Sequence, residues 1–143
     1  MPAIQFFEED VAYKLKDKAK VKAWIKDTIV AEGFKLSELN YIFCSDDYLL
    51  QINQQYLHHD TYTDIVTFDN SEQEGVIISD IFISIPRIKE NAEKFKVSVV
   101  DELHRVLIHG ALHLLGYKDK SASDKKKMTE KEDLYLAKRQ FIG

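Results

Sequence analysis

Two histidines four residues apart are the side chains in this sequence best suited to chemistry. His109 and His113 lie within a long apolar run that is interrupted at Gly116. In a helix, residues i and i+4 lie on the same face, so the two imidazoles can present ring nitrogens to one cation. A metal ion held in this way needs at least a third ligand. The first carboxylates after the turn are those of Asp119 and Asp124.

The residues around the two histidines favour a metal site over histidines that only pack in a core. Apolar residues recur at intervals of three and four, and others cover most of the remaining surface, which predicts a helix packed on several sides. The apolar stripe consists of Val99, Leu103, Val106, Leu107, Gly110 and Leu114. A buried ring nitrogen without a partner costs roughly 1 to 3 kcal/mol. A shared cation satisfies both rings.

The residue after the first histidine restricts the kind of chemistry. Zinc peptidases carry Glu at that position, where it acts as the general base. This chain has Gly110 there, and glycine has no group that accepts a proton. The sequence therefore argues against peptidase chemistry and indicates a different hydrolytic family.

Three segments of the sequence resemble a known family. HGALHLLGYKD is similar to the HGxLHLxGYDH signature of the YbeY family of bacterial metal-dependent endoribonucleases. INQQYLHHDTYTDIVTF resembles the LNxxYRxxDxPTDVLSF segment of that family, and ISDIFIS resembles the LGDIxIS strand that follows it. The three segments keep the family's order and spacing from Ile52 to about Asp119.

The resemblance implies a single-strand-specific, metal-dependent endoribonuclease that acts in ribosomal RNA maturation and ribosome quality control. It implies one divalent metal ion, expected to be zinc, held by His109, His113 and Asp119. The family usually has a third His at the last position; a carboxylate can ligate zinc there, and it favours harder ions somewhat more. The expected partners are ribosomal RNA and the ribosome or a ribosomal protein.

Other positions bear on catalysis. Leu57 stands where the family has an Arg thought to be important for activity, and leucine cannot pair with phosphate. Asp80 interrupts the apolar strand VIISDIFIS, and we interpret it as orienting a ligating histidine or as structural, the alternative being an exposed strand face. Lys118 and Lys120, on either side of Asp119, are candidate RNA contacts.

The attacking group is not identified beyond a water molecule on the metal. In this interpretation the metal polarises a phosphoryl oxygen and lowers the pKa of the water that attacks the phosphodiester. Attack by the substrate's own 2′-hydroxyl is an alternative. Two other functions compete: a ribosome-associated binding factor with a structural metal, and a metal-dependent hydrolase of another substrate.

Composition bounds these possibilities. The 143 residues, of which 45% are hydrophobic and 31% charged, suit one domain over residues 1–143. The net charge of −4 is unlike that of most free-standing nucleic-acid binders, although lysines cluster at 14–26 and 118–127. With one cysteine, Cys44, and no signal-peptide or membrane-spanning pattern, we expect a cytoplasmic protein without a membrane partner.

Periodicity predicts the elements that position the histidines. Alternating and 3.6-residue patterns, with turn and capping residues between them, indicate four strands and about five helices. The expected strands cover residues 3–8, 39–44, 64–68 and 76–84; the expected helices end at about 33, 56, 95, 116 and 140. We expect an α+β fold: one four-stranded mixed sheet packed with about five helices, with the histidine helix central among them.

Overall fold

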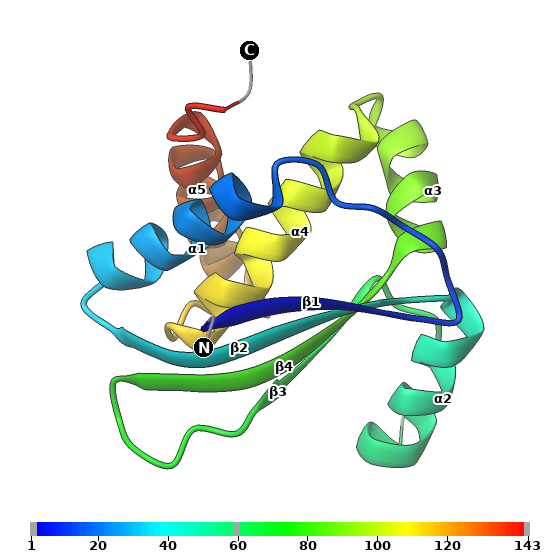
Figure 1. The fold of residues 1–143 in the computed structure, drawn as a ribbon, viewed down its shortest axis with the longest axis horizontal. Coiled ribbons are helices and arrows are strands. Elements are labelled where there is room, and N and C mark those ends of the chain that lie inside the picture. Colours follow the sequence, from blue (N-terminus) through cyan, green and yellow to red (C-terminus); the bar gives the residue numbers. More distant parts are fainter. Residues whose placement is uncertain (1–2, 59–60, 142–143) are drawn as a thin grey trace.

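A four-stranded sheet with helices on both faces forms the structure, a computed structural model that describes residues 3–58 and 61–141 (Figure 1). In chain order the elements are β1 (Ile4–Glu9), α1 (Lys18–Ala31), β2 (Lys35–Cys44), α2 (Asp46–Leu57), β3 (Ile65–Asp69), β4 (Val76–Ser84), α3 (Ile85–Phe95), α4 (Val99–Leu114) and α5 (Ala122–Ala137). The expected α+β fold is confirmed, with the histidines on α4.

The sheet is mixed, in the order β1-β2-β4-β3. Strand β2 pairs parallel with both β1 and β4, and β3 pairs antiparallel with β4. The polar segment between β3 and β4 contains the expected turn, where Gly75 has a φ of 82° that favours glycine. Strand β3 is therefore one edge of the sheet, and its first residue, Ile65, pairs with Ile83.

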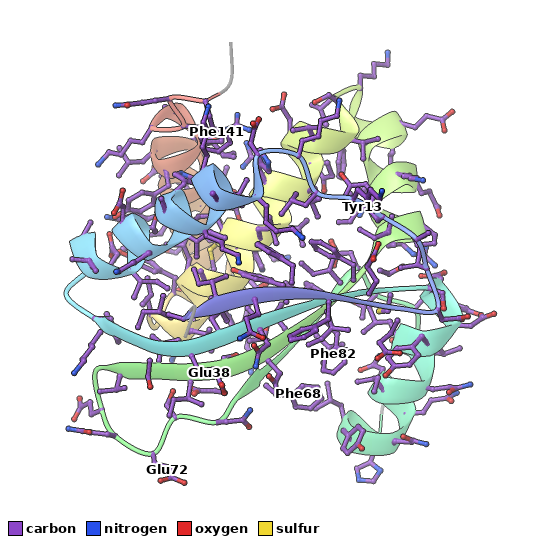
Figure 2. The ribbon with its side chains drawn as sticks, in the orientation of Figure 1. Tyr13, Glu38, Phe68, Glu72, Phe82 and Phe141 are labelled. Carbon is purple, nitrogen blue, oxygen red and sulfur yellow. The ribbon has the colours of Figure 1, made fainter. Side chains whose placement is uncertain are left out.

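Helices cover the two faces of the sheet unequally. Helices α1, α3, α4 and α5 lie on one side and α2 lies on the other (Figure 1). The main core lies under the first group, whereas α2 buries a smaller cluster around Leu49 and Val66. Phe68 and Phe82 lie between the sheet and α2, with ring centroids 5.7 Å apart (Figure 2).

Serine residues begin four of the five helices. The hydroxyls of Ser45, Ser84, Ser98 and Ser121 each accept a hydrogen bond from the backbone N–H three residues later, at 3.0 to 3.3 Å. Such caps satisfy N–H groups that a helix leaves unpaired, and each contributes about 1 kcal/mol. Each of these serines therefore marks the residue at which its helix begins.

Two boundaries differ from the sequence expectation by three residues or more. Strand β2 begins at Lys35, four residues earlier than predicted, because its first half pairs with Val76 to Ile78 across an irregularity at Leu36 and Glu38. Helix α5 ends at Ala137 and not near residue 140. Pairing with β4 extends β2 beyond the residues whose apolar and polar side chains alternate in the sequence.

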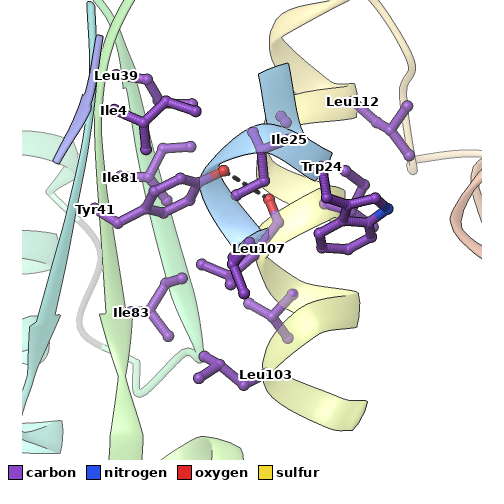
Figure 3. Close-up of a cluster of buried hydrophobic side chains, with 14 of the residues drawn as sticks. Ile4, Trp24, Ile25, Leu39, Tyr41, Ile81, Ile83, Leu103, Leu107 and Leu112 are labelled. Carbon is purple, nitrogen blue, oxygen red and sulfur yellow. Dashed lines mark hydrogen bonds between the residues drawn. The ribbon is translucent and has the colours of Figure 1, made fainter. Parts of the chain in front are cut away.

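Helix α4 is the centre of the main core. Its residues Leu103, Leu107, Ile108 and Leu112 are fully buried against the sheet and its neighbouring helices. Tyr41 of β2, also fully buried, donates its hydroxyl proton to the carbonyl oxygen of Leu107 at 2.9 Å (Figure 3). This bond links the middle of α4 to the sheet and so fixes the position of the histidine-bearing helix relative to the strands.

Two further observations concern the cysteine and the length of the apolar helices. Cys44 is fully buried in β2, and burial, together with nearby carboxylates, raises the pKa of its thiol to about 12, so it is not a nucleophile at neutral pH. Within the described part of the chain, no helix is both long and apolar enough to span a bilayer.

A third histidine on α4 makes stability depend on pH. His104 is 2% exposed; burial, and then the charge of Arg139 at 2.8 Å from its Nδ1, lower its pKa to about 4. Because the unfolded chain takes up a proton near pH 6.5 and the folded one does not, stability falls as pH drops from about 6.5 toward 4.

We expect this histidine alone to reduce the free energy of unfolding by about 2 kcal/mol between pH 7 and pH 5. Urea unfolding of wild type and His104→Asn at both pH values measures it. Asn keeps an acceptor for Arg139 but does not titrate, so its loss of stability over this range should be smaller by that amount. Equal losses in the two proteins would contradict the assignment.

Candidate active site

His109 is held from both sides of its ring. It lies half-buried in the third turn of α4. Its Nδ1 is 2.6 Å from Oε2 of Glu132 on α5, and its Nε2 is 3.4 Å from Oδ2 of Asp119 in the loop between α4 and α5. A carboxylate on Nδ1 sets the ring orientation and directs Nε2 toward Asp119.

The separation between His109 and Asp119 suits two ligands of one ion. Donors of a tetrahedral ion with bonds of about 2.1 Å lie about 3.4 Å apart. The Asp119 side chain is 44% exposed, so solvent and substrate reach this point. The chemistry and spacing of the pair therefore fit a divalent cation, with a carboxylate oxygen and an imidazole nitrogen as donors.

His113 follows one turn later on the same helix. It is exposed, and among the described residues its imidazole takes part in no hydrogen bond or ion pair. Residues 3–58 and 61–141 contain no ready-made group of three His, Cys, Asp or Glu side chains around a point. Coordination by all three predicted ligands therefore requires the exposed His113 side chain to turn toward the pair.

Glu132 was not predicted from the sequence. It is 6% exposed, and its second oxygen, Oε1, accepts a hydrogen bond at 2.8 Å from Arg105, which also reaches Asp133 at 2.7 Å. Glu132 belongs to the buried face of α5, between Met128 and Tyr135. An acidic residue at i+4 in an apolar stripe was the available signal, because a buried carboxylate requires partners.

The surroundings of His109 are acidic. Burial lowers the pKa of His109, but the hydrogen bond and charge of Glu132, and the charges of Asp119 and Asp64, raise it above its ordinary value overall. Burial raises the pKa of Glu102, which is 6% exposed, and the charges of Asp64 and Glu132 add to that rise. A site with this excess of carboxylates attracts a cation.

Asp80 does not orient either histidine of α4. Its carboxylate accepts hydrogen bonds from Asn40 at 3.0 Å and from Asn70 at 3.4 Å. Side chains alternate along β4, and the buried Ile81 faces α4, so Asp80 points to the other face of the sheet. The alternative of an outward strand face agrees with these contacts, and Glu132 is the residue that bonds His109.

Comparison with known proteins shows the family of this chain. A family model described as "Endoribonuclease YbeY" matches residues 4–140. The chain belongs to the YbeY family. A relative named Endoribonuclease YbeY from Cytophaga hutchinsonii is 54% identical over 96% of this chain and 96% of its own length. Another with that name, from Bacteroides thetaiotaomicron, is 44% identical over 96% of this chain and 99% of its own length.

A solved structure supports the same fold. The solution structure of a protein from Thermotoga maritima matches this chain with a TM-score of 0.65 and 29% identity, over 93% of this chain and 86% of that one. The predicted family is confirmed by these matches. They extend the resemblance from the central segments to almost the whole chain.

One departure from the YbeY pattern and the two candidate RNA contacts can now be placed. Leu57 is the last residue of α2 and is 39% exposed, so its position is open to solvent but offers no charge. Lys118 and Lys120 are exposed on either side of Asp119. Positive charge therefore lies beside the candidate metal site, although it comes from the loop after α4 and not from α2.

The glycine of the YbeY signature also has a steric explanation. A Cβ atom built on Gly110 would lie 3.0 Å from Cδ1 of Ile65 and 3.0 Å from Cδ1 of Ile81. At this point α4 therefore approaches β3 and β4 closely. The glutamate that zinc peptidases have after their first histidine would point into this contact and would have to displace the two isoleucine side chains.

We expect Gly110→Val to lower the free energy of unfolding by about 1 to 3 kcal/mol, because its extra methyl groups overpack this contact. Gly110→Ala should be nearly neutral, since the helix propensity of Ala, better by about 1 kcal/mol, offsets a contact with the ends of two isoleucines. Denaturant midpoints of the three proteins test this. Equal midpoints for wild type and Gly110→Val would show that the helix does not pack this closely.

Proposed function

We propose that this chain is a metal-dependent endoribonuclease that cleaves single-stranded ribosomal RNA during its maturation and in ribosome quality control. The observation that carries the proposal is the environment of His109, which has Glu132 on Nδ1 and Asp119 at 3.4 Å from Nε2. Membership in a family named for endoribonuclease activity supports RNA as the substrate.

In this proposal His109, His113 and Asp119 hold one divalent ion, with zinc as the first candidate. When bound there, the ion supplies a Lewis acid for a phosphoryl oxygen and lowers the pKa of a water molecule. Glu132 accepts a hydrogen bond from the Nδ1–H of His109 and so leaves Nε2 available for coordination. Metal binding also offsets the excess of carboxylates, which would otherwise repel the RNA backbone.

Lysines beside the site would position the substrate. Lys118 and Lys120, together with the exposed lysines at 125–127 at the start of α5, offer several ammonium groups to the phosphates of a single strand. Leu57 has no positive charge to offer, so in this proposal these lysines neutralise the phosphate charges of the substrate. The net charge of −4 suits an enzyme whose RNA is presented by the ribosome or a ribosomal protein, in the cytoplasm.

The cleavage products show whether water or the 2′-hydroxyl of the substrate is the attacking nucleophile. Cleavage by water leaves a linear phosphate at one end, whereas attack by the 2′-hydroxyl leaves a 2′,3′-cyclic phosphate. Mass spectrometry of the fragments of a short single-stranded RNA separates the two mechanisms.

The proposal is tested by measuring bound metal and cleavage of single-stranded and double-stranded RNA by wild type and by His113→Ala. We expect wild type to contain about one equivalent of metal and to cleave the single strand only. His113→Ala should lose both metal and cleavage. Cleavage that persists in His113→Ala would indicate a contaminating nuclease and would contradict the proposal.

A second function is favoured by Leu57 and by the acidic net charge: a ribosome-associated binding factor with a structural metal. A structural zinc site is closed by four protein ligands, whereas a catalytic one keeps an open position. X-ray absorption of the metal-loaded protein counts these ligands. Four protein donors and no cleavage of RNA would support the binding factor.

A further inference from the structure

Glu32, at the C-terminal end of α1, gathers three donors from distant parts of the chain. Its Oε1 accepts a hydrogen bond at 2.6 Å from the hydroxyl of Tyr117. Its Oε2 accepts one from the hydroxyl of Tyr135 and one at 3.3 Å from Nζ of Lys131. The Glu32 side chain is only 13% exposed, so these bonds replace most of its contacts with water.

Tyr117 connects this cluster to the loop that carries Asp119. Helix α4 ends at a turn in which Gly116 has a φ of 101°, and the N–H of Tyr117 donates to the carbonyl of Leu112 at 3.2 Å. Tyr117 is the next residue, two positions before Asp119. Lys127 and Lys131 lie 5.9 and 5.7 Å from the centre of its ring. The Tyr117 side chain is therefore the anchor of this loop.

The turn of α5 that contains Lys131 also holds His109, the candidate ligand that faces Asp119. Lys131 bonds Glu32, and the next residue, Glu132, bonds Nδ1 of His109. The Asp119 loop and the His109 ring are thus both tied to consecutive residues of one helix. Displacing Tyr117 by even 1 Å would change the separation of 3.4 Å between Nε2 of His109 and Oδ2 of Asp119.

We propose that Glu32 is a positioning residue for the metal site, which acts by holding Tyr117 and thereby the Asp119 loop against His109. The inference rests on the proposed function for the identity of the ligands. Glu32 does not touch metal or substrate; its effect is on how well the loop is placed before an ion binds. Preorganised ligands bind an ion more tightly than ligands that must first be ordered.

The test is zinc affinity, measured with a competing chelator on folded apoprotein, for wild type, Glu32→Gln, Tyr117→Phe and the double variant. We expect each single variant to bind zinc about three- to tenfold more weakly, less than the tenfold or more typical of residues bonded directly to a ligand. Because Glu32→Gln weakens and Tyr117→Phe removes the same link, the double variant should bind zinc no more weakly than Tyr117→Phe alone.

Two controls separate positioning from general stability. Thr28→Val removes the hydrogen bond at 3.0 Å from Thr28 to the carbonyl of Trp24, also on α1 but apart from the loop. Tyr62→Phe makes the same change as Tyr117→Phe in a tyrosine outside this cluster, whose hydroxyl bonds Asp47 of α2 at 3.4 Å. Both should keep zinc affinity within about twofold of wild type, less than any change expected for a residue that supports a ligand.

The outcomes distinguish this inference from the proposed function. Wild type that binds no zinc, or binds it without need of Asp119, overturns the metal site and this role of Glu32 with it. Wild type that binds zinc through Asp119, with Glu32→Gln no weaker than Thr28→Val, overturns the role of Glu32 alone. Additive losses in the double variant would show that Glu32 does not act through Tyr117.

Discussion

Asp119→Ala is expected to lose bound metal and RNA cleavage together, with metal affinity falling by more than the roughly 10- to 100-fold that loss of a residue behind a ligand causes. The reason is the position of its Oδ2 at 3.4 Å from Nε2 of His109, a separation that suits two ligands of one ion. Metal analysis of the purified protein and zinc titration measure the effect.

Asp124→Ala is the matched control for this prediction. Asp124 is the second carboxylate after α4, but it belongs to the first turn of α5, where its N–H bonds the cap residue Ser121 at 3.0 Å. We expect this variant to keep its metal, with at most a small loss of stability from the helix terminus. If Asp124→Ala lost metal while Asp119→Ala kept it, the third ligand would be Asp124.

Glu132→Gln is expected to weaken zinc binding by about 10- to 100-fold while His109, His113 and Asp119 remain in place. The amide is neutral, so it supports the ring of His109 less well than a carboxylate does. It also cannot accept from both His109 and Arg105 as Oε2 and Oε1 now do, at 2.6 and 2.8 Å. Zinc titration and RNA cleavage at saturating zinc measure the change.

Asp80→Asn is the control for Glu132→Gln, because it makes the same chemical change in a carboxylate on the opposite face of the sheet. Its partners are Asn40 and Asn70, so we expect unchanged zinc affinity. Excess zinc should restore much of the activity of Glu132→Gln, since that variant keeps its ligands. A loss of zinc affinity in Asp80→Asn as large as in Glu132→Gln would contradict the role of Glu132 as the specific support of His109.

The contact between Glu132 and His109 illustrates a limit of prediction from the sequence. A capping serine before a charge-rich segment indicated the helix α5, but a carboxylate on its buried face can be satisfied by any donor that the fold brings near. Glu132 and His109 are 23 residues apart, and Glu32 and Tyr117 are 85 apart. Neither pair has a local pattern, because each depends on how two helices dock.

Asp80 illustrates a related limit. Alternation along β4 predicts that Asp80 and Ile81 face opposite sides of the sheet, but it does not say which side α4 covers. With helices on both faces, an acidic residue in this strand was compatible with a role beside the histidines or away from them. Packing of α4 on Ile81 decided between these positions.

The sequence by itself determined the local features of this protein: the strands and helices, the serine caps, the glycine turn after α4, the family, and a pair of histidines on one helical face. These depend on residues a few positions apart, whose geometry the backbone sets. The tertiary structure alone decided which ring nitrogen Asp119 faces, that Glu132 holds the other, and that Glu32 anchors the loop. Those contacts join segments far apart in the chain, and they exist only because α1, α4 and α5 pack together over one sheet.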